Sequence, residues 1–230
     1  MRLAVIPARG GSKRIPRKNI RQFHGKPMIG WSIEAAQKAN CFDQIIVSTD
    51  DDEIAEISRD FGAEVPFIRP KELADDHTGT IPVVAQAIDW YKDQGLNPKY
   101  ICCIYATAPF IRETDILSGL EKIKAPGIDY AFSVTNYDFP IQRAITITQS
   151  GSIEMIDSAF MNTRSQDLKE TYHDAGQFYW GCAEAWTNDI PIFSSTAVPI
   201  VLPRHRVQDI DTEEDWMRAE VMFDAILRFE

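Results

Sequence analysis

Cysteine and long apolar runs are both scarce in this chain of 230 residues. The four cysteines lack the paired spacing of a zinc or redox site, and Cys102 and Cys103 lie inside an apolar stretch, which favours free buried thiols over disulfides. No apolar run approaches the roughly 20 residues of a membrane span. The run after Arg2 stops at a proline, unlike a signal peptide. We therefore expect a cytoplasmic protein with no membrane partner.

Positive charge is also in short supply. Lys and Arg number 24 against 34 Asp and Glu, which gives a formal net charge of -10 and a pI near 4.9. A field of this sign repels nucleic acid and anionic membranes, so neither is expected as a partner. The hydrophobic content of 44% is that of an ordinary soluble globule. This length fits one domain, spanning 1–230, with a small insertion.

Short apolar runs alternate with helical patterns through the first 135 residues. We expect strands at 3–6, 45–49, 64–68, 100–105 and 130–135, with helices between them. That alternation predicts an α/β fold, a three-layer doubly wound arrangement with a mainly parallel sheet. From about 136 to 195 short segments and turns replace the alternation of strands and helices, which indicates an insertion. A strand at 198–202 and a helix from Thr212 complete the expected fold.

A basic loop follows the first strand of this acidic chain. Residues 9–19 carry five basic side chains: Arg9, Lys13, Arg14, Arg17 and Lys18. The spacing matches neither a Walker A loop nor a dinucleotide fingerprint. Gly10 and Gly11 can expose backbone N–H groups, and Ser12 and Asn19 add neutral hydrogen-bonding groups, so the loop suits a polyanion. Arg14 and Arg17 could equally face solvent, whereas Arg9 and Lys18 are favoured for function.

Other polar groups follow later strands of the expected sheet. Ligands bind at the carboxyl ends of parallel strands, so the loops bearing Arg69, Thr107 and Asp209 should converge on the basic loop. Asp209 and Asp211 lie on one side of an extended segment, where two carboxylates could hold Mg²⁺ against phosphate oxygens. Alternatively, Asp211 or Thr212 only caps the last helix.

The stretch from Gly176 to Gly181, preceded by His173 and Asp174, mixes aromatic and polar groups. It suits either a sugar site or an alternating strand in a small core. Isolated histidines and the lack of a Ser–His–Asp or Cys–His arrangement argue against covalent catalysis.

Taken together, these loops resemble a known family over almost the whole chain. Ile6 to Lys13, Pro16 to Asn19, Ser48 to Asp50, Arg69 to Leu73 and Asp209 to Thr212 are similar, in collinear order, to motifs of the CMP-sialate synthetases, a cytidylyltransferase family. The stretches 137–143, 162–167 and 172–180 resemble the branch of that family that activates pseudaminic acid, a bacterial relative of sialic acid.

The resemblance implies a nucleotide-diphospho-sugar transferase-like fold, a homodimer formed through the insertion, and a reaction. CTP and a nine-carbon 2-keto sugar acid would give the CMP-sugar and pyrophosphate, supplying a donor for glycan or flagellin glycosylation. The anomeric hydroxyl would attack the α-phosphorus, its proton passing to a metal-held Asp209 or to a metal-bound hydroxide. Arg9, Lys18 and Asp209 would be catalytic, and Asp209 and Asp211 would hold Mg²⁺ or another divalent cation.

The resemblance also assigns binding residues. The nucleotide would contact Ala8, Arg9, Gly10, Gly11, Ser12, Lys13, Lys18, Asn19, Arg69, Thr78, Thr80 and Thr107. The sugar would contact Tyr105, Arg164, His173, Gln177 and Tyr179.

Two departures from the family shape the expected substrate. Tyr105 stands where the sialic-acid branch has a sugar-facing glutamine, which disfavours ordinary sialic acid. The loop after the fourth strand has no aspartate of the kind that Kdo-activating relatives use for metal. Legionaminic or N-acetylneuraminic acid remains an alternative substrate. Two further alternatives are a metal-dependent glycosyltransferase, although its D-x-D usually follows a central strand, and a non-catalytic nucleotide-binding protein.

Overall fold

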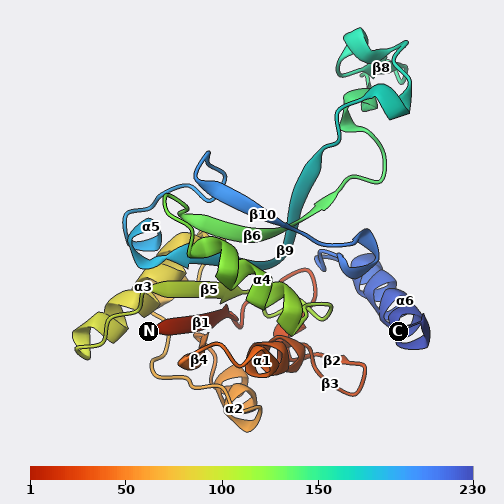
Figure 1. Cartoon of the computed structure of the whole chain (residues 1–230). Coiled ribbons are helices and arrows are strands. Elements are labelled where there is room, and N and C mark those ends of the chain that lie inside the picture. The colour runs from red at the N-terminus through yellow and green to blue at the C-terminus, as the bar shows by residue number, and fades with distance from the viewer. Residues whose placement is uncertain (230) are drawn as a thin grey trace.

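The apolar runs near the N-terminus form the middle of a six-stranded sheet in the computed structural model, which describes residues 1–229. The strand order is β10-β6-β9-β5-β1-β4 (Figure 1). Their bounds are Arg2–Pro7 (β1), Gln44–Ser48 (β4), Tyr100–Ile104 (β5), Tyr130–Asn136 (β6), Tyr172–Cys182 (β9) and Ala197–Val201 (β10). Strand β1 pairs in parallel with both β4 and β5, and β6 pairs in parallel with β10. The predicted mainly parallel sheet is confirmed.

One strand runs against the others. Strand β9 is antiparallel to both neighbours, β5 and β6. Its side chains serve both faces of the sheet, since Phe178 and Trp180 enter one core and Tyr179 the other. This strand lies within 136–195, where the sequence indicated an insertion, and it belongs to the main sheet.

The strand expected at 64–68 does not form as a continuous element. Only Glu64 and Ile68 make bridges, to Ile46 and Thr49 respectively. Pro66 lies between them. A proline has no N–H to donate to a ladder, so it interrupts the pairing of an otherwise apolar run. The segment is an edge of the sheet rather than one of its strands.

Helices cover both faces of the sheet. Their bounds are Met28–Ala39 (α1), Asp52–Asp60 (α2), Thr80–Asp93 (α3), Glu113–Ile123 (α4), Ala183–Thr187 (α5) and Glu213–Phe229 (α6). Alternate residues of β1 point to opposite sides, so Ala4 and Ile6 join a core with α1, α2 and α4, whereas Leu3 and Val5 join a core with α3 and α5. Single 3-10 turns occur at Lys18–Ile20, Lys71–Leu73, Ile141–Arg143, Ser158–Phe160, Ser165–Asp167 and Arg204–Arg206.

A third, smaller core joins the two ends of the chain. It contains Ile15 of the basic loop and Ile210 of the D-x-D segment, both almost fully buried. Phe23 packs edge-on against Trp216 and Phe223 of α6. The hairpin β2 (Gln22–Phe23) and β3 (Lys26–Pro27) supplies part of this core. The packing brings the basic loop and the two aspartates to one place.

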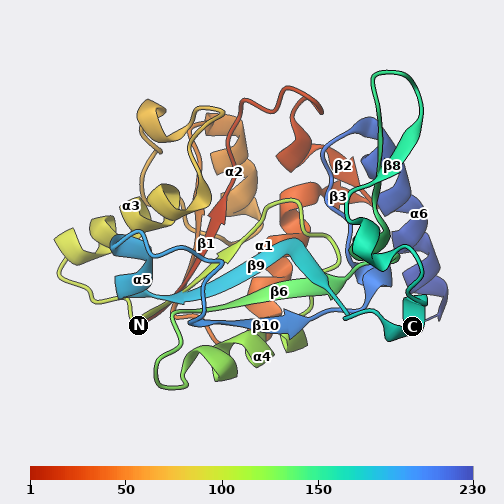
Figure 2. The ribbon, with the colours of Figure 1, turned by 90° about the horizontal axis from the view of Figure 1, so that it is seen from above.

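Residues 137–171 project from the body of the molecule (Figure 1). Figure 2 shows this segment, seen from above, over the side of the body that carries α6. Within it, β7 (Ile145–Ile147) and β8 (Ile153–Met155) form a two-stranded sheet that is separate from the main one. The projecting segment is thus the central part of the predicted insertion, and the paired strands β6 and β9 connect it to the body.

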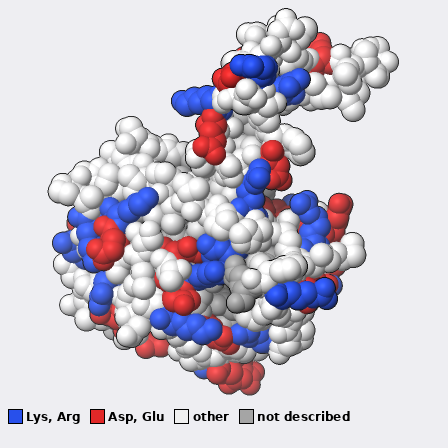
Figure 3. Space-filling model, turned by 45° about the vertical axis from the view of Figure 1, so that its right-hand side comes forward, with Lys and Arg blue, Asp and Glu red and all other residues white. Residues whose placement is uncertain are grey.

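The surface and the thiols agree with the composition. On the face drawn in Figure 3, basic and acidic side chains are interspersed over the body. Cys41, Cys102 and Cys103 are buried free thiols, as predicted, and Cys182 is a half-buried one. No helix within residues 1–229 is both long enough and apolar enough to cross a membrane.

Candidate active site

Hydrogen bonds to the end of β4 and within the loop itself hold the basic loop in place. The amide of Ala8 donates to the carbonyl of Ser48 over 2.9 Å, and that of Gly10 donates to Asp50 Oδ1 over 3.0 Å. The side chain of Asn19 donates to the carbonyl of Arg9 over 3.0 Å. A Cβ at Gly10 would lie 2.6 Å from Asp51 Oδ2, so this close approach requires glycine. The loop therefore has a defined shape.

A cavity of about 260 Å³ opens where β1 and β5 end. It is lined by Pro7, Arg9, Ser12, Arg14, Lys18, Asn19, Arg69, Thr78, Gly79, Thr80, Val83, Tyr105, Ala106, Thr107 and Asp211. The structure therefore brings together the loops after strands β1 and β5, the start of α3 and the D-x-D segment. The expected convergence at the carboxyl ends of the strands is what the structure has. We call this space the nucleotide cavity, after the ligand that the sequence leads us to expect there.

Not every member of the basic loop faces the nucleotide cavity. Arg9 and Lys18 line it, and the Lys18 side chain is only 18% exposed. The Lys13 side chain is 79% exposed and lies outside the lining, as do Ala8, Gly10 and Gly11. These last three shape the loop, so any contact with a ligand would come through their backbone.

Arg14 and Arg17, which the sequence could not separate, have different surroundings. Arg14 lines the nucleotide cavity and pairs with Asp211 Oδ2 over 2.9 Å. Arg17 turns away and grips Asp51 with bonds of 2.6 and 3.0 Å, while a third contact reaches Glu53. The Arg17 guanidinium lowers the pKa of Asp51, which caps α2 by accepting from the amide of Ile54. Arg14 belongs to the site, and Arg17 holds the loop to α2.

Arg69 is the one strongly buried cation of the lining, with an exposure of 5%. Its guanidinium donates to Ser48 Oγ over 3.0 Å and to the carbonyl of Ser48. Burial lowers the pKa of Arg69 to about 10, with Asp50 opposing the shift. A cation fixed this way offers a rigid hydrogen-bond donor at the wall of the cavity.

The turn before α3 presents two threonines to the same cavity. Thr78 is held by Asp75, whose Oδ1 accepts from the Thr78 amide and hydroxyl, both over 2.7 Å. Thr80 begins α3, and its hydroxyl lies 3.0 Å from that of Tyr105. Thr78, Thr80 and Thr107 all line the cavity, as expected from the sequence.

The D-x-D segment brings a carboxylate into the cavity. Asp211 pairs with Lys18 over 3.2 Å as well as with Arg14, and Lys18 also donates to the carbonyl of Ile210. Asp209 lies outside the lining. Desolvation by the surrounding protein, followed by the negative charge of Asp211, raises the pKa of Asp209. The helix cap considered as an alternative belongs to Thr212, whose hydroxyl oxygen accepts from the amide of Asp215 over 3.2 Å, while the Asp215 carboxylate accepts from the amides of Asp211 and Thr212.

These carboxylates set a limit on metal binding. Among residues 1–229, no group of three or more His, Cys, Asp and Glu side chains is arranged to hold a metal ion. Two nearby carboxylates, of which Asp211 contributes to the raised pKa of Asp209 through its negative charge, do fit a hard cation, provided that further oxygen ligands come from a phosphate. Asp209 and Asp211 suit a shared site with a ligand rather than a closed protein cage.

A second cavity of about 390 Å³ adjoins the first and shares Gly79, Thr80 and Tyr105 with it. Its remaining lining is Ile81, Pro82, Asp174, Tyr179, Asp189, Ile192 and Phe193. The rings of Tyr105 and Tyr179 lie 5.2 Å apart, and the Tyr179 hydroxyl donates to Asp174 Oδ2 over 2.6 Å. Burial, followed by Tyr105 and Asp174, raises the pKa of Tyr179, so its hydroxyl remains a donor at neutral pH. We call this space the adjoining cavity.

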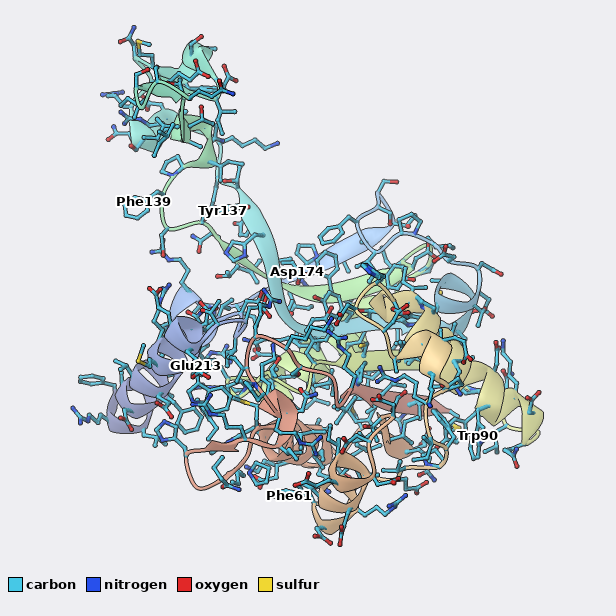
Figure 4. The ribbon with its side chains drawn as sticks, turned by 180° about the vertical axis from the view of Figure 1, so that it is seen from behind. Phe61, Trp90, Tyr137, Phe139, Asp174 and Glu213 are labelled. Carbon is cyan, nitrogen blue, oxygen red and sulfur yellow. The ribbon has the colours of Figure 1, made fainter. Side chains whose placement is uncertain are left out.

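Of the predicted sugar residues, Tyr105 and Tyr179 line the adjoining cavity, and three others lie elsewhere. Arg164 belongs to the projecting segment, is 72% exposed and pairs with Asp167 over 2.7 Å. The ring of His173 lies 4.8 Å from that of Tyr137 in a tilted arrangement, and it contacts the carbonyl of Asp174. Gln177 is buried and donates to the carbonyl of Arg206, so it ties β9 to a neighbouring turn. In Figure 4, Asp174 lies at the foot of the projecting segment that carries Tyr137 and Phe139.

The sequence missed one polar side chain of this region, Asp76, and left two others, Asp174 and Arg14, undecided. Asp174 enters the adjoining cavity because β9 is a strand of the main sheet, which the alternation after Gly176 favoured only as one of two options. Arg14 gave no signal beyond its charge. Asp76, which contacts both Arg9 and Lys13, lies in a polar turn with no motif around it.

Comparisons with known proteins agree with this geometry. A family model described as "Cytidylyltransferase" matches residues 3–223. The chain is 42% identical to a pseudaminic acid cytidylyltransferase of Campylobacter jejuni over 221 residues, covering 96% of this chain and 95% of the relative. A bifunctional Helicobacter pylori protein, named as a pseudaminic acid cytidylyltransferase and a hydrolase, is 34% identical over 90% of this chain and 40% of its own. A solved CMP:2-keto-3-deoxy-manno-octonic acid synthetase complexed with CTP shares the fold, with a TM-score of 0.69, 17% identity and coverage of 97% and 98%.

Proposed function

The chain belongs to the cytidylyltransferase family, and on that premise we propose that it joins CTP to pseudaminic acid, giving CMP-pseudaminic acid and pyrophosphate. The observation that carries the choice of sugar is the 42% identity, over 96% of the chain, to a pseudaminic acid cytidylyltransferase. The reaction needs CTP, which cells hold in the cytoplasm, so a cytoplasmic location follows from the proposal.

In this reaction the anomeric hydroxyl oxygen of the sugar forms a bond to the α-phosphorus of CTP. The bond between that phosphorus and the oxygen bridging to the β-phosphorus breaks, and pyrophosphate leaves with the electron pair. The hydroxyl proton passes to a carboxylate, for which Asp209 is our candidate. Such a transfer needs positioning and charge neutralisation more than a protein nucleophile, which suits a site rich in basic groups.

The nucleotide cavity supplies those groups. Arg9 and Lys18 line it and would neutralise the triphosphate, with Ser12 and Asn19 as neutral donors beside them. The buried guanidinium of Arg69 and the hydroxyl of Thr80 lie on the same lining and would face the base and ribose. A uniform basic surface would bind phosphate without orientation, whereas this lining combines three basic side chains of one loop with a buried guanidinium, a carboxylate and threonine hydroxyls from other segments.

We propose that Asp209 and Asp211 hold Mg²⁺ against the phosphate oxygens of CTP. When bound, the ion would neutralise part of the triphosphate charge and favour departure of pyrophosphate. Asp211 already lies in the lining, beside Lys18 and Arg14. These two basic residues would then be released to the phosphates.

The adjoining cavity is the proposed sugar site. It contacts the nucleotide cavity through Thr80 and Tyr105, so a sugar there would present its hydroxyl near the nucleotide. Tyr105 and Tyr179 offer hydroxyls and ring faces, and Asp174 offers a carboxylate oxygen. This lining lacks the glutamine expected of the sialic-acid branch, because Tyr105 takes its place.

The projecting segment supports a homodimer. Its large apolar side chains face solvent, including Phe139 at 84%, Ile147 at 77% and Ile153 at 68% exposed, and the two-stranded sheet has no core of its own. An isolated two-stranded sheet is marginal in water, so a second copy of the chain is the occupant we propose. Sedimentation should give a dimer that Phe139→Asp with Ile147→Asp dissociates, while Leu96→Asp, 48% exposed on the body, leaves it intact. A wild-type monomer would refute the dimer.

The deciding experiment measures pyrophosphate release from CTP with Mg²⁺ and a panel of sugar acids. Pseudaminic acid should support the highest kcat/KM, ahead of legionaminic and N-acetylneuraminic acids. Preference for either of the others would keep the reaction class and change the sugar. Release with none of them would refute the cytidylyltransferase, and a glycosyltransferase would instead release CMP from a preformed CMP-sugar.

A further inference from the structure

Asp76 bridges two basic residues of the loop after β1, one of which, Arg9, lines the nucleotide cavity. It lies in the turn between the 3-10 segment Lys71–Leu73 and α3, and its side chain is 35% exposed. One carboxylate oxygen contacts the guanidinium of Arg9, and the other contacts the ammonium of Lys13. The two basic residues come from the loop after β1, more than 60 positions earlier in the chain. These bonds, Lys13 first, lower the pKa of Asp76 to about 2.

The neighbouring carboxylate, Asp75, does something else. Its Oδ1 accepts from the amides of His77 and Thr78 over 2.9 and 2.7 Å and from the hydroxyl of Thr78 over 2.7 Å. Asp75 thus forms the turn that leads into α3. Two adjacent acids of equal charge therefore have separate contacts, and only Asp76 reaches the basic loop.

The Asp76 carboxylate makes the same kind of contact with Arg9 and Lys13 that a phosphate group would make. A carboxylate presents two oxygens to cationic donors, as one edge of a phosphate does. Arg9 lines the nucleotide cavity, so a triphosphate that binds there needs the donor that Asp76 now occupies. Asp211, which pairs with Arg14 and Lys18 of the loop, can exchange these basic partners for a cation, but the contacts of Asp76 offer it no such exchange.

We propose that Asp76 is an internal competitor of the phosphates, which sets how tightly the enzyme holds CTP and pyrophosphate. This inference rests on the proposed function. Entry of CTP breaks the contacts of Asp76 with Arg9 and Lys13, and the same contacts re-form as pyrophosphate leaves. The carboxylate weakens substrate binding and in return speeds release of a product that carries much of the same charge.

The test is direct binding of CTP and of pyrophosphate, each with Mg²⁺ and without sugar, by calorimetry. Asp76→Asn should tighten both by about three- to tenfold, because two partly exposed ion pairs no longer compete. Asp75→Asn removes the same charge one residue away, keeps an acceptor oxygen for the turn, and should bind as the wild type does. Asp76→Glu, which keeps the charge, should lie closer to the wild type than Asp76→Asn. In turnover, Asp76→Asn should lower the KM for CTP and leave the KM for the sugar unchanged.

Four results would overturn the inference. Equal tightening by Asp75→Asn would mean a general effect of charge. Weaker binding by Asp76→Asn would mean that Asp76 holds Arg9 ready for phosphate, and unchanged binding would mean that it does not compete. Wild-type protein that fails to bind CTP would remove the proposed function and this inference with it. Asp76→Ser also removes the charge, so its CTP binding gives the same test should Asp76→Asn fold poorly. Thermal melting of both variants checks that they fold.

Discussion

Replacing Arg14 by alanine is the sharpest test of the site, because the loop contains a matched arginine three positions away. Arg14 lines the nucleotide cavity, and its side chain is 67% exposed. A hydrogen bond to a charged group contributes about 1.5–3 kcal/mol, and solvent screening at this exposure reduces that to about 1–2 kcal/mol. At 1.36 kcal/mol for each factor of ten, Arg14→Ala should lower kcat/KM for CTP by about 5- to 30-fold.

Arg17→Ala removes the same charge from the same loop and should have a different effect. Arg17 contacts Asp51 and Glu53 instead of the cavity, and its side chain is 38% exposed. Losing this pair should cost about 1 kcal/mol of unfolding free energy and lower the Tm by about 2–4 °C, with kcat/KM within about twofold of the wild type.

The assay is pyrophosphate release at varied CTP, with saturating sugar and Mg²⁺, beside thermal melts of both variants. Ionic strength gives a second check, since the effect of Arg14→Ala on the KM for CTP should shrink as salt screens the triphosphate. Equal losses of kcat/KM in the two variants would refute the reasoning, because the loop would then act only through its summed charge. An unchanged rate in Arg14→Ala would remove that residue from the phosphate site.

Three further substitutions test other parts of the site. Asp211→Asn should reduce turnover by more than about 100-fold at any Mg²⁺ concentration, as expected of a lost metal ligand, with an unchanged melting temperature; near-normal turnover would refute the metal assignment. Lys18→Met, which keeps most of the buried stem, should lower kcat/KM for CTP by about 10- to 100-fold, and an unaltered value would end its proposed role. Tyr179→Phe deletes the donor to Asp174 and should raise the KM for the sugar by about 3- to 10-fold without changing the KM for CTP; equal changes in both would place this residue outside the sugar site.

Much of the fold was predictable because its signals are local. The apolar runs at β1, β5 and β6 and the spacing of Ile54 and Ile57 in α2 each report on a few neighbouring residues. The run at 64–68 failed for an equally local reason, which is the missing N–H of Pro66. The position of β9 depended on pairing with two strands about 45 and 80 residues away, and no local pattern reports such a partner.

The residues of the site also divide into those that the sequence could predict and those that it could not. Arg9, Lys18, Arg69 and Asp211 were predictable because strand ends of a parallel sheet meet at one edge and the motifs resemble a family. The different surroundings of Arg14 and Arg17 were not predictable from the sequence. They depend on the left-handed backbone of Arg17, with φ of 55°, which turns that side chain toward α2. The burial of Gln177 was missed because its partner, a backbone carbonyl, carries no sequence signal.

The small core that contains Ile15 and Ile210 also affects the order in which parts of the protein fold. Lys18 and Asp211 are 193 positions apart, and the contact between them depends on packing of α6 against the hairpin near the N-terminus. Closing so long a loop carries a high entropic cost, so this contact should form late in folding, after the sheet and its local helices. The nascent chain would therefore have an ordered sheet before it has a working phosphate site. Local opening of α6 in the finished protein would switch the site off while the sheet stays intact.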